Sequence, residues 1–370
     1  MQQLFGTVST QVGSLLKTAS CISLAVFGLS LSVAKASDCP ASGLDHFVCD
    51  IPSAEDLVLL PDTPWLFASA YAGGSLLNII NTNTKSWQVI APSGDYSEEH
   101  DKGRFSDCPG PVAQQTIVTH GLHLAQQNDD TAILYAVGHG AREAIEVFDI
   151  RARGSDRPSV RWIGCVPAPD GQEVNSVVSL ANGDLLATIP LETGFEFAQA
   201  MSGVDTGAVY RWTAGTGEWQ RLDVTAQPYG NGISVSEDET RFYVASSGLR
   251  QVTAYTNSDA PVVLGVSEVL AIAPDNLHRD AAGALITGGM LFEYTACNPL
   301  DEDGEFSLSA FATCPRPYQI VSVDPDTLAT TVVIEGAANP SFSNITMGVQ
   351  VKDLMWMGSF GADRVAYRSR

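Results

Sequence analysis

Oxygen-bearing side chains recur at one point of a repeated phrase in this sequence, just before a strand-like run. The set holds two carboxylates and three amides: Glu55, Asn175, Asn231, Asp275 and Asn276. Carboxylate and amide carbonyl oxygens are the ligands that Ca²⁺ prefers in proteins. Taken singly, such residues are commonest in turns and caps, and Asn-Gly and Asp-Asn are ordinary turn dipeptides. Their recurrence at one place in the repeat predicts a calcium site.

Two histidines could supply acid–base chemistry beside such an ion. His120 begins one strand-like run and His139 follows the end of the next. If these two strands pair, the imidazoles meet, and they could relay a proton or activate water near neutral pH. The alternative for each histidine is a hydrogen-bonded structural role. His123 lies on the opposite strand face from His120, which argues against a zinc pair.

Other catalytic motifs are absent from the sequence. It contains no G-x-S-x-G, so a serine-hydrolase elbow is not supported. It also contains no G-x-G-x-x-G and no P-loop, which argues against dinucleotide or nucleoside-triphosphate chemistry.

The elements that must position these residues read as strands. Short apolar or alternating runs, such as 65–71, 132–137, 144–150 and 241–246, are bounded by Gly, Asp, Asn and Pro. Strong amphipathic helices are hard to find, and only 193–204 could form a short one. The sequence therefore predicts an all-β protein.

A loose repeat groups these strands into six similar units. The copies lie at 65–82, 122–148, 177–212, 233–255, 277–324 and 347–369. A hairpin cannot bury both of its faces alone, so radial stacking is the natural solution. We therefore predict a six-bladed β-propeller with a central metal-binding tunnel; a pair of β-sandwiches would explain six similar units poorly. The last copy ends at the C-terminus, so an N-terminal strand must complete it, and 57–60 is the candidate.

The first 36 residues read as a signal peptide, cleaved after Ala36. An apolar run covers 22–33, and Ala34-Lys35-Ala36 has the small-residue pattern of a cleavage site. A buried N-terminal helix is the alternative, and the position of Cys21 before the apolar run disfavours a lipoprotein. We expect a secreted or periplasmic protein whose residues 37–370 form one propeller domain.

Six cysteines remain in the exported chain, and an even number favours disulfides. Fifteen pairings are possible. We favour Cys39–Cys49 and Cys297–Cys314, because each closes a short loop, which leaves Cys108–Cys165. Zinc is the alternative, but the sequence has no C-x-x-C.

Composition excludes several partners. The formal net charge is −22 with only 20 basic residues, so phosphate backbones would repel the chain and nucleic-acid binding is not expected. No run reaches the roughly 18 apolar residues that a transmembrane helix needs. The expected partner is a small molecule.

Several phrases resemble the paraoxonase/arylesterase family of six-bladed propellers. They are AEDLVLLPD at 54–62, VTHGLHL at 118–124, LYAVGHGAREAIEVFDI at 134–150, EVNSVVSL at 173–180, YGNGISVSEDETRFYVASS at 229–247 and APDNLHRD at 273–280. They follow the family's order over most of 54–290. The sequence is more distantly similar to gluconolactonase and strictosidine-synthase-like propellers.

The resemblance implies roles for individual residues. The five residues of the oxygen-bearing set match ligands of the family's catalytic Ca²⁺, and His120 and His139 match its histidine pair. Asp56, with the carbonyl of Leu122, matches part of a second, structural Ca²⁺ site. There the match breaks, because Ser176 follows Asn175 where the family has Asp, so the second ion is doubtful. The family's disulfide between the N-terminus and the last strand also lacks a counterpart.

The leading hypothesis is a calcium-dependent hydrolase of lactones or aryl esters. A Ca²⁺ ion would polarise the carbonyl, and the histidine pair would activate water. Tyr71 and Tyr229 are candidates to line the substrate site, which favours an uncharged ester. Two alternatives remain: a non-catalytic exported propeller in which Ca²⁺ is only structural, and a gluconolactonase-type lactonase that uses a different divalent ion with Asp275 as base.

Overall fold

The computed structural model describes residues 39–90, 95–113, 116–154, 156–297 and 307–370. The predicted signal peptide at 1–36 lies outside these described residues. A compact unit covers residues 34–370, and all that follows concerns this unit.

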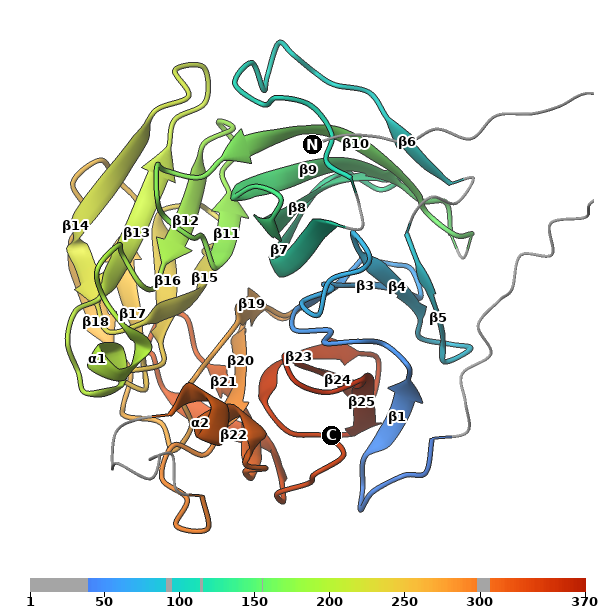
Figure 1. The fold of residues 1–370 in the computed structure, drawn as a ribbon, viewed down its shortest axis with the longest axis vertical. Coiled ribbons are helices and arrows are strands. Elements are labelled where there is room, and N and C mark those ends of the chain that lie inside the picture. Colours follow the sequence, from blue (N-terminus) through green and yellow to red (C-terminus); the bar gives the residue numbers. More distant parts are fainter. Residues whose placement is uncertain (1–38, 91–94, 114–115, 155, 298–306) are drawn as a thin grey trace, which may run out of the picture. The chain divides into compact units, whose positions relative to one another are not determined.

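Six sheets follow one another along the chain in sequence order, each hydrogen-bonded as a separate blade (Figure 1). From the inner strand outward, the first three are β2 (Leu57–Leu59), β3 (Trp65–Ala68), β4 (Asn78–Asn81) and β5 (Ser86–Val89); β7 (Ile117–Asn128), β8 (Thr131–Gly140), β9 (Ala144–Arg151), β10 (Ser159–Pro167) and β6 (Tyr96–Glu98); and β11 (Ser176–Ser179), β12 (Leu185–Ile189), β13 (Gly207–Trp212) and β14 (Trp219–Gln227). The other three are β15 (Gly230–Val235), β16 (Arg241–Ser246), β17 (Gln251–Thr256) and β18 (Val263–Val266); β19 (Leu277–Arg279), β20 (Leu285–Met290), β21 (Tyr318–Val323) and β22 (Thr330–Gly336); and β23 (Ile345–Val351), β24 (Leu354–Ser359), β25 (Arg364–Ser369) and β1 (His46–Cys49).

The inner ends of the blades close into a ring. Strand β2 contacts β7, β7 contacts β11, β11 contacts β15 and β15 contacts β19. Strand β20 of the fifth blade contacts β23, and β23 contacts β2. Neighbouring blades therefore cover both faces of each sheet, as radial stacking requires. The predicted all-β six-bladed propeller is confirmed.

Burial from both faces explains why several strands read as continuous apolar runs. In β9, the first seven residues are all buried, and the exposed residue comes only at Arg151. Phe148 and Trp162 of this blade are almost fully buried, as is Phe67 of the blade before it. A sheet with one face in water would instead alternate buried and exposed positions.

The sixth blade is closed by an N-terminal strand, as predicted, but not by the predicted segment. Strand β1 pairs antiparallel with β25, with His46 opposite Tyr367 and Cys49 opposite Arg364. The candidate at 57–60 was wrong, because Leu57–Leu59 is β2, the innermost strand of the first blade. Both segments are short apolar runs, so the sequence pattern alone does not separate an outer strand from an inner one.

The described residues contain the three disulfides that were expected: Cys39–Cys49 and Cys297–Cys314, which short loops favoured, and Cys108–Cys165, the pair that remained. The first lies at the end of β1, so it tethers the closing strand to the segment before it. Strand pairing and this bond together hold the closing strand of the sixth blade.

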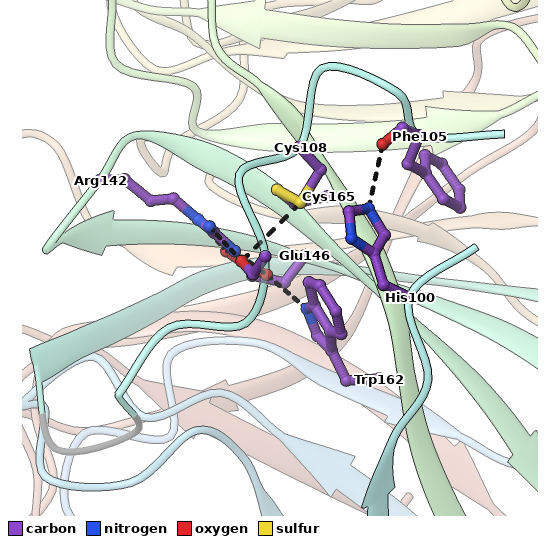
Figure 2. Close-up of a disulfide and its surroundings, with 8 residues drawn as sticks. His100, Phe105, Cys108, Arg142, Glu146, Trp162 and Cys165 are labelled. Carbon is purple, nitrogen blue, oxygen red and sulfur yellow. Dashed lines mark hydrogen bonds and ion pairs between the residues drawn. A yellow bond between two sulfur atoms is a disulfide. The ribbon is translucent and has the colours of Figure 1, made fainter. Parts of the chain in front are cut away.

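The second disulfide strengthens the blade that carries both candidate catalytic histidines. Cys108 lies in the loop before β7, and Cys165 lies in β10. Figure 2 shows Glu146 beside this bond, between Arg142 and the indole of Trp162. Arg142 donates from Nε and Nη2 to the two carboxylate oxygens over 2.8 Å, and Trp162 Nε1 donates over 2.7 Å. Charge-assisted, bidentate bonds of this kind hold a buried carboxylate in one geometry.

The described residues contain two short helices. Helix α1 (Phe197–Met201) begins with a capping box between Glu196 and Gln199 and falls inside the predicted segment 193–204. Helix α2 (Leu308–Thr313) was not predicted; Ser307 caps its start by accepting a bond from the amide of Ala310. Within the described part of the chain, no helix is both long and apolar enough to cross a membrane.

Candidate metal and catalytic site

The predicted oxygen-bearing residues lie in, or just before, the inner strands of four blades. Glu55 precedes β2, Asn175 precedes β11, Asn231 lies in β15, and Asp275 and Asn276 precede β19. Asn276 Nδ2 donates to Glu55 Oε1 over 2.6 Å, although 221 residues separate the two in sequence. This hydrogen bond joins the fifth blade to the first.

Four oxygens of this set are buried without a protein donor. Glu55, Asn175, Asn231 and Asn276 are at most 4% exposed. Their atoms Glu55 Oε2, Asn175 Oδ1, Asn231 Oδ1 and Asn276 Oδ1 have no hydrogen-bond partner. Only two other buried side-chain oxygens in the described residues, those of Gln227 and Asn344, share this condition. Buried oxygens without donors are costly, so these four atoms are candidate ligands for a cation.

The amide orientations are set by neighbours. Asn231 donates from Nδ2 to Ser247 Oγ over 3.3 Å, and Ser247 Oγ donates to the carbonyl of Pro274 over 2.7 Å. Asn276 donates from Nδ2 to Glu55 Oε1. In both cases the amide nitrogen is engaged by the protein, which leaves the carbonyl oxygen for a ligand.

The carboxylates of the site lack a countercharge. Burial raises the pKa of Glu55 well above its usual range, and the charges of Asp275 and Asp56 raise it further. Burial also raises the pKa of Asp275 to about 7. A divalent cation would relieve the burial cost and the repulsion together. Within the described residues, no three His, Cys, Asp or Glu side chains cluster as a metal site, so any ion here depends on the amide oxygens.

The two candidate histidines lie side by side at the mouth of this site. His120 Nδ1 and His139 Nε2 are 3.2 Å apart, and His120 Nε2 lies 3.7 Å from Glu55 Oε1. Burial and the neighbouring His139 lower the pKa of His120 to about 3, so its imidazole is neutral near pH 7. His120 therefore presents its Nε2 toward the oxygen-bearing set in a form that can accept a proton.

A third residue extends the pair. Glu143 Oε2 lies 2.5 Å from His139 Nδ1. A carboxylate on one ring nitrogen fixes the tautomer and the ring orientation, so that Nε2 faces His120. Glu143, His139 and His120 therefore form a hydrogen-bonded chain whose last member lies beside Glu55. The spacing of Glu143 four residues after His139 was a signal that sequence analysis missed.

Aromatic rings surround the mouth. Tyr71 lies 4.6 Å from His120, centroid to centroid. Phe197 of α1 lies 5.0 Å from Tyr229 and 5.8 Å from Phe311 of α2. The pKa values of Tyr71 and Tyr229 are both raised, first by burial and then by charges that include Asp275 and Glu55. Both tyrosines therefore lie near enough to Glu55 and Asp275 to feel their charges. The two phenylalanines, one from each helix, extend this aromatic surface.

Asp56, the residue matched to the second calcium site, is bound differently. Its Oδ1 accepts bonds from His278 Nε2 over 2.7 Å and from the amide of Leu57 over 2.8 Å, and its Oδ2 accepts one from the amide of Leu122 over 2.7 Å. Burial lowers the pKa of His278, but the charge and hydrogen bond of Asp56 outweigh this, so the pKa lies above its usual value. Leu122 offers its N–H here, where the resemblance implied its carbonyl.

Two glycines let the ligand-bearing segments approach one another. A Cβ on Gly121 would lie 2.4 Å from the carbonyl oxygen of Asn175, and one on Gly232 would lie 2.3 Å from the amide of Leu277 and 2.5 Å from the carbonyl of Asp275. The Asn231-Gly232 pair lies inside β15 and not at a turn. The turn interpretation is therefore wrong for this dipeptide, since the glycine serves interblade packing.

Replacement of Gly232 by alanine is expected to destabilise the protein by about 1–3 kcal/mol, because the added methyl group would overlap backbone of the next blade. Cation affinity should fall as well, since the displaced backbone carries Asp275. Thermal unfolding with and without Ca²⁺ measures both effects. Gly103→Ala is the matched control, because its Cβ would meet only the Asp101 side chain at 3.3 Å. Equal melting temperatures for the two variants would contradict the packing role.

A hollow of about 370 Å³ opens elsewhere, between the loop before β7 and the hairpin of β13 and β14. Arg104, Phe105, Trp212 and Trp219 are among its lining residues. No residue of the oxygen-bearing set and neither histidine lines it. We place the candidate site at the inner strands because the unpartnered oxygens and the histidine pair lie on or beside them.

Comparison with known proteins supports the fold. No protein-family model matches the sequence, and no curated protein sequence matches it either. Among solved structures, a gluconolactonase from Xanthomonas campestris has a TM-score of 0.52 and 15% identity over 88% of this chain and 89% of that chain. A protein provisionally named a gluconolactonase has a TM-score of 0.50 and 14% identity over 90% and 93%. The calcium-binding protein regucalcin from Agrobacterium tumefaciens has a TM-score of 0.48 and 10% identity over 86% and 90%. At such identities the likeness to the first two structures shows a shared propeller fold and no more.

Proposed function

We propose that this protein is a hydrolase of lactones or aryl esters that requires a divalent cation, with Ca²⁺ as the expected ion. The observation that carries the proposal is the convergence of four buried, unpartnered oxygens beside a neutral histidine. Buried oxygens normally have hydrogen-bond donors, so the four without them support a bound cation, and the adjacent histidine supports a catalytic one. The names of the gluconolactonase-like neighbours support the lactone class, and the paraoxonase-like phrases support aryl esters as well.

The residues fit a calcium ion. Glu55, Asn175, Asn231, Asp275 and Asn276 would hold it, with two formal negative charges and hard oxygen donors. A bound Ca²⁺ would polarise an ester carbonyl and stabilise the negative charge that develops on its oxygen.

The histidine chain performs the proton transfers in this proposal. His120 Nε2 accepts a proton from water as the water oxygen bonds to the carbonyl carbon. The bond from that carbon to the alkoxy oxygen then breaks, and His120 returns the proton to the leaving oxygen. His139 holds Nδ1 of His120 in place, and Glu143 holds His139.

The rim favours an uncharged, apolar substrate. Tyr71, Phe197, Tyr229 and Phe311 offer aromatic surface. The net charge of −22 would repel an anionic ester. An acyl or aryl group can pack on this rim while its carbonyl reaches the oxygen-bearing set.

The proposal is tested by hydrolysis of phenyl acetate and a panel of lactones by the mature protein. The assay runs as purified, after EDTA, and after Ca²⁺ is restored. Activity that EDTA removes and Ca²⁺ restores supports the proposal. If no substrate is hydrolysed while Ca²⁺ still raises the melting temperature, the protein is a propeller in which the ion is only structural, and the proposal fails.

A gluconolactonase-type mechanism is the second candidate, and the fold neighbours favour it. In it, a different divalent ion replaces Ca²⁺ and Asp275 acts as the base. Restoring the EDTA-treated protein with Mg²⁺, Mn²⁺ or Zn²⁺ tests the ion. Persistence of activity in His120→Gln would identify this mechanism.

Glu143→Gln is expected to lower kcat about tenfold and to leave KM and Ca²⁺ affinity unchanged, because Glu143 acts only through His139. Glu143→Ala should lower kcat further than Glu143→Gln does, because glutamine can still hydrogen-bond the imidazole and alanine cannot. Steady-state kinetics on the best lactone measures this. Glu218→Gln, at an exposed position, is the matched control. Equal kcat values for Glu143→Ala and the wild type would show that the carboxylate does not position the pair.

We also infer export to an oxidising compartment. Three disulfides within one chain persist in secreted and periplasmic proteins and are rare in reducing cytosol. Sequencing of the N-terminus of the exported protein should begin at Ser37. A mature protein that retains residues 22–33 would contradict the signal-peptide prediction.

A further inference from the structure

Asp56 occupies a point where three blades meet. It directly precedes β2 of the first blade, bonds the amide of Leu122 in β7 of the second, and bonds the imidazole of His278 in β19 of the fifth. The side chain of Asp56 is fully buried and that of His278 is 17% exposed. A carboxylate without exposure needs its charge and its oxygens satisfied within the fold.

Both oxygens of Asp56 are satisfied by protein donors. Two donors reach Oδ1 and one reaches Oδ2, each at 2.7–2.8 Å. Neither oxygen belongs to the buried atoms without partners, in contrast to Oε2 of its neighbour Glu55. A cation at Asp56 would have to displace the imidazole of His278 from Oδ1. At Oδ2 it would be repelled by the N–H dipole of Leu122.

The other expected ligand of a second ion is missing as well. Ser176 stands where the resemblance places a carboxylate, and its own amide donates to Thr188 Oγ1 over 3.1 Å. The site therefore offers one carboxylate where a structural calcium site needs several oxygen ligands. The residues present do not fit a second Ca²⁺.

We propose that His278 takes the place of the second, structural calcium ion, so that the protein binds a single divalent ion. The imidazole gives Asp56 Oδ1 a hydrogen bond over 2.7 Å at the position where the ion would bind. The bond between His278 and Asp56 joins the fifth blade to the first. The bond from the Leu122 amide to Asp56 joins the second blade to the first. The count of one ion rests on the proposed function, while the exclusion of an ion at Asp56 does not.

The surroundings of His278 agree with this role. His123 of β7 lies close enough for the two imidazole charges to oppose each other, and burial with this repulsion lowers the pKa of His123 to about 3. The imidazole that bonds Asp56 is that of His278. Tyr135 packs against His123 with ring centroids 6.1 Å apart.

The test counts tightly bound Ca²⁺ ions per chain. The protein is loaded with Ca²⁺, exchanged into metal-free buffer and measured by atomic emission, with isothermal titration for affinities. We expect one ion for the wild type and two for the variant His278→Ala/Ser176→Asp, which removes the imidazole and restores a carboxylate. His46→Gln, at an exposed position of β1, is the control and should bind one ion.

Two ions in the wild type, with one of them lost in Asp56→Asn, would overturn the proposal. The ion counts of the wild type and of Asp56→Asn do not depend on the double variant. They therefore test the proposal even if the double variant folds poorly. If the wild type binds no ion, the proposed function fails instead, and a gain of one ion in the double variant would still support the assignment of His278. A double variant that folds but gains no ion would count against it.

Discussion

Asp275→Ala is expected to abolish hydrolysis and cation binding together, with activity reduced by at least about 100-fold. The carboxylate supplies one of the two formal charges in the oxygen-bearing set, and its loss leaves Glu55 as the single charged ligand. The stabilisation of a developing oxyanion by a metal is worth several kcal/mol, and about 2.7 kcal/mol corresponds to a 100-fold change in rate. Lactone hydrolysis and calcium titration measure the two losses on one sample.

The isosteric change Asp275→Asn separates charge from shape, because it retains an oxygen ligand and removes the negative charge. It should bind Ca²⁺ more weakly than the wild type and more tightly than Asp275→Ala. Asp259→Ala, in an exposed loop, is the matched control for loss of an aspartate. Full activity in Asp275→Ala would show that the ligand assignment is wrong.

His120→Gln is expected to lower kcat by about 10² to 10⁴, the range typical of general acid–base catalysis, and to leave Ca²⁺ bound. Its Nε2 lies 3.7 Å from Glu55 Oε1. His120 is not a member of the oxygen-bearing set, whose unpartnered atoms are the proposed cation ligands. Removing it should therefore take away the proton acceptor and spare the cation. Single-turnover rates and calcium titration of the same variant distinguish these effects.

His46→Gln controls for the loss of a histidine, because His46 stacks on Tyr367 at the outer edge of the sixth blade. Wild-type kcat in His120→Gln would remove this residue from the mechanism and favour Asp275 as the base. Loss of Ca²⁺ in the same variant would instead show that His120 belongs to the cation site.

The two predictions differ in what they rest on. The role of Asp275 follows from ligand type and from four blades converging, and either change at this residue tests it directly. The role of His120 depends in addition on the chain Glu143–His139–His120, whose bonds of 2.5 Å and 3.2 Å place its members in order. A result that spares one prediction and contradicts the other would therefore separate the metal assignment from the base assignment.

The sequence was informative wherever chemistry is encoded locally. The recurring oxygen-bearing residues, the two histidines and the six strand-like repeats could all be read directly, because strand entry points repeat with the blade. Two disulfide pairs followed from short loop lengths, and the third was the pair that remained. These features depend on residues near one another in the chain or on a repeated position, so no knowledge of tertiary contacts was needed.

Only the tertiary structure decided which segments meet. It showed that β1 closes the sixth blade while 57–60 lies at the centre, because two short apolar runs look alike until their partners are known. It placed His278 on Asp56 across 222 residues of sequence, where the local pattern indicated only a carboxylate for an ion. It also showed that Gly232 serves close packing and not a turn. Contacts between blades join residues far apart in the chain, and a short-range pattern carries no record of them.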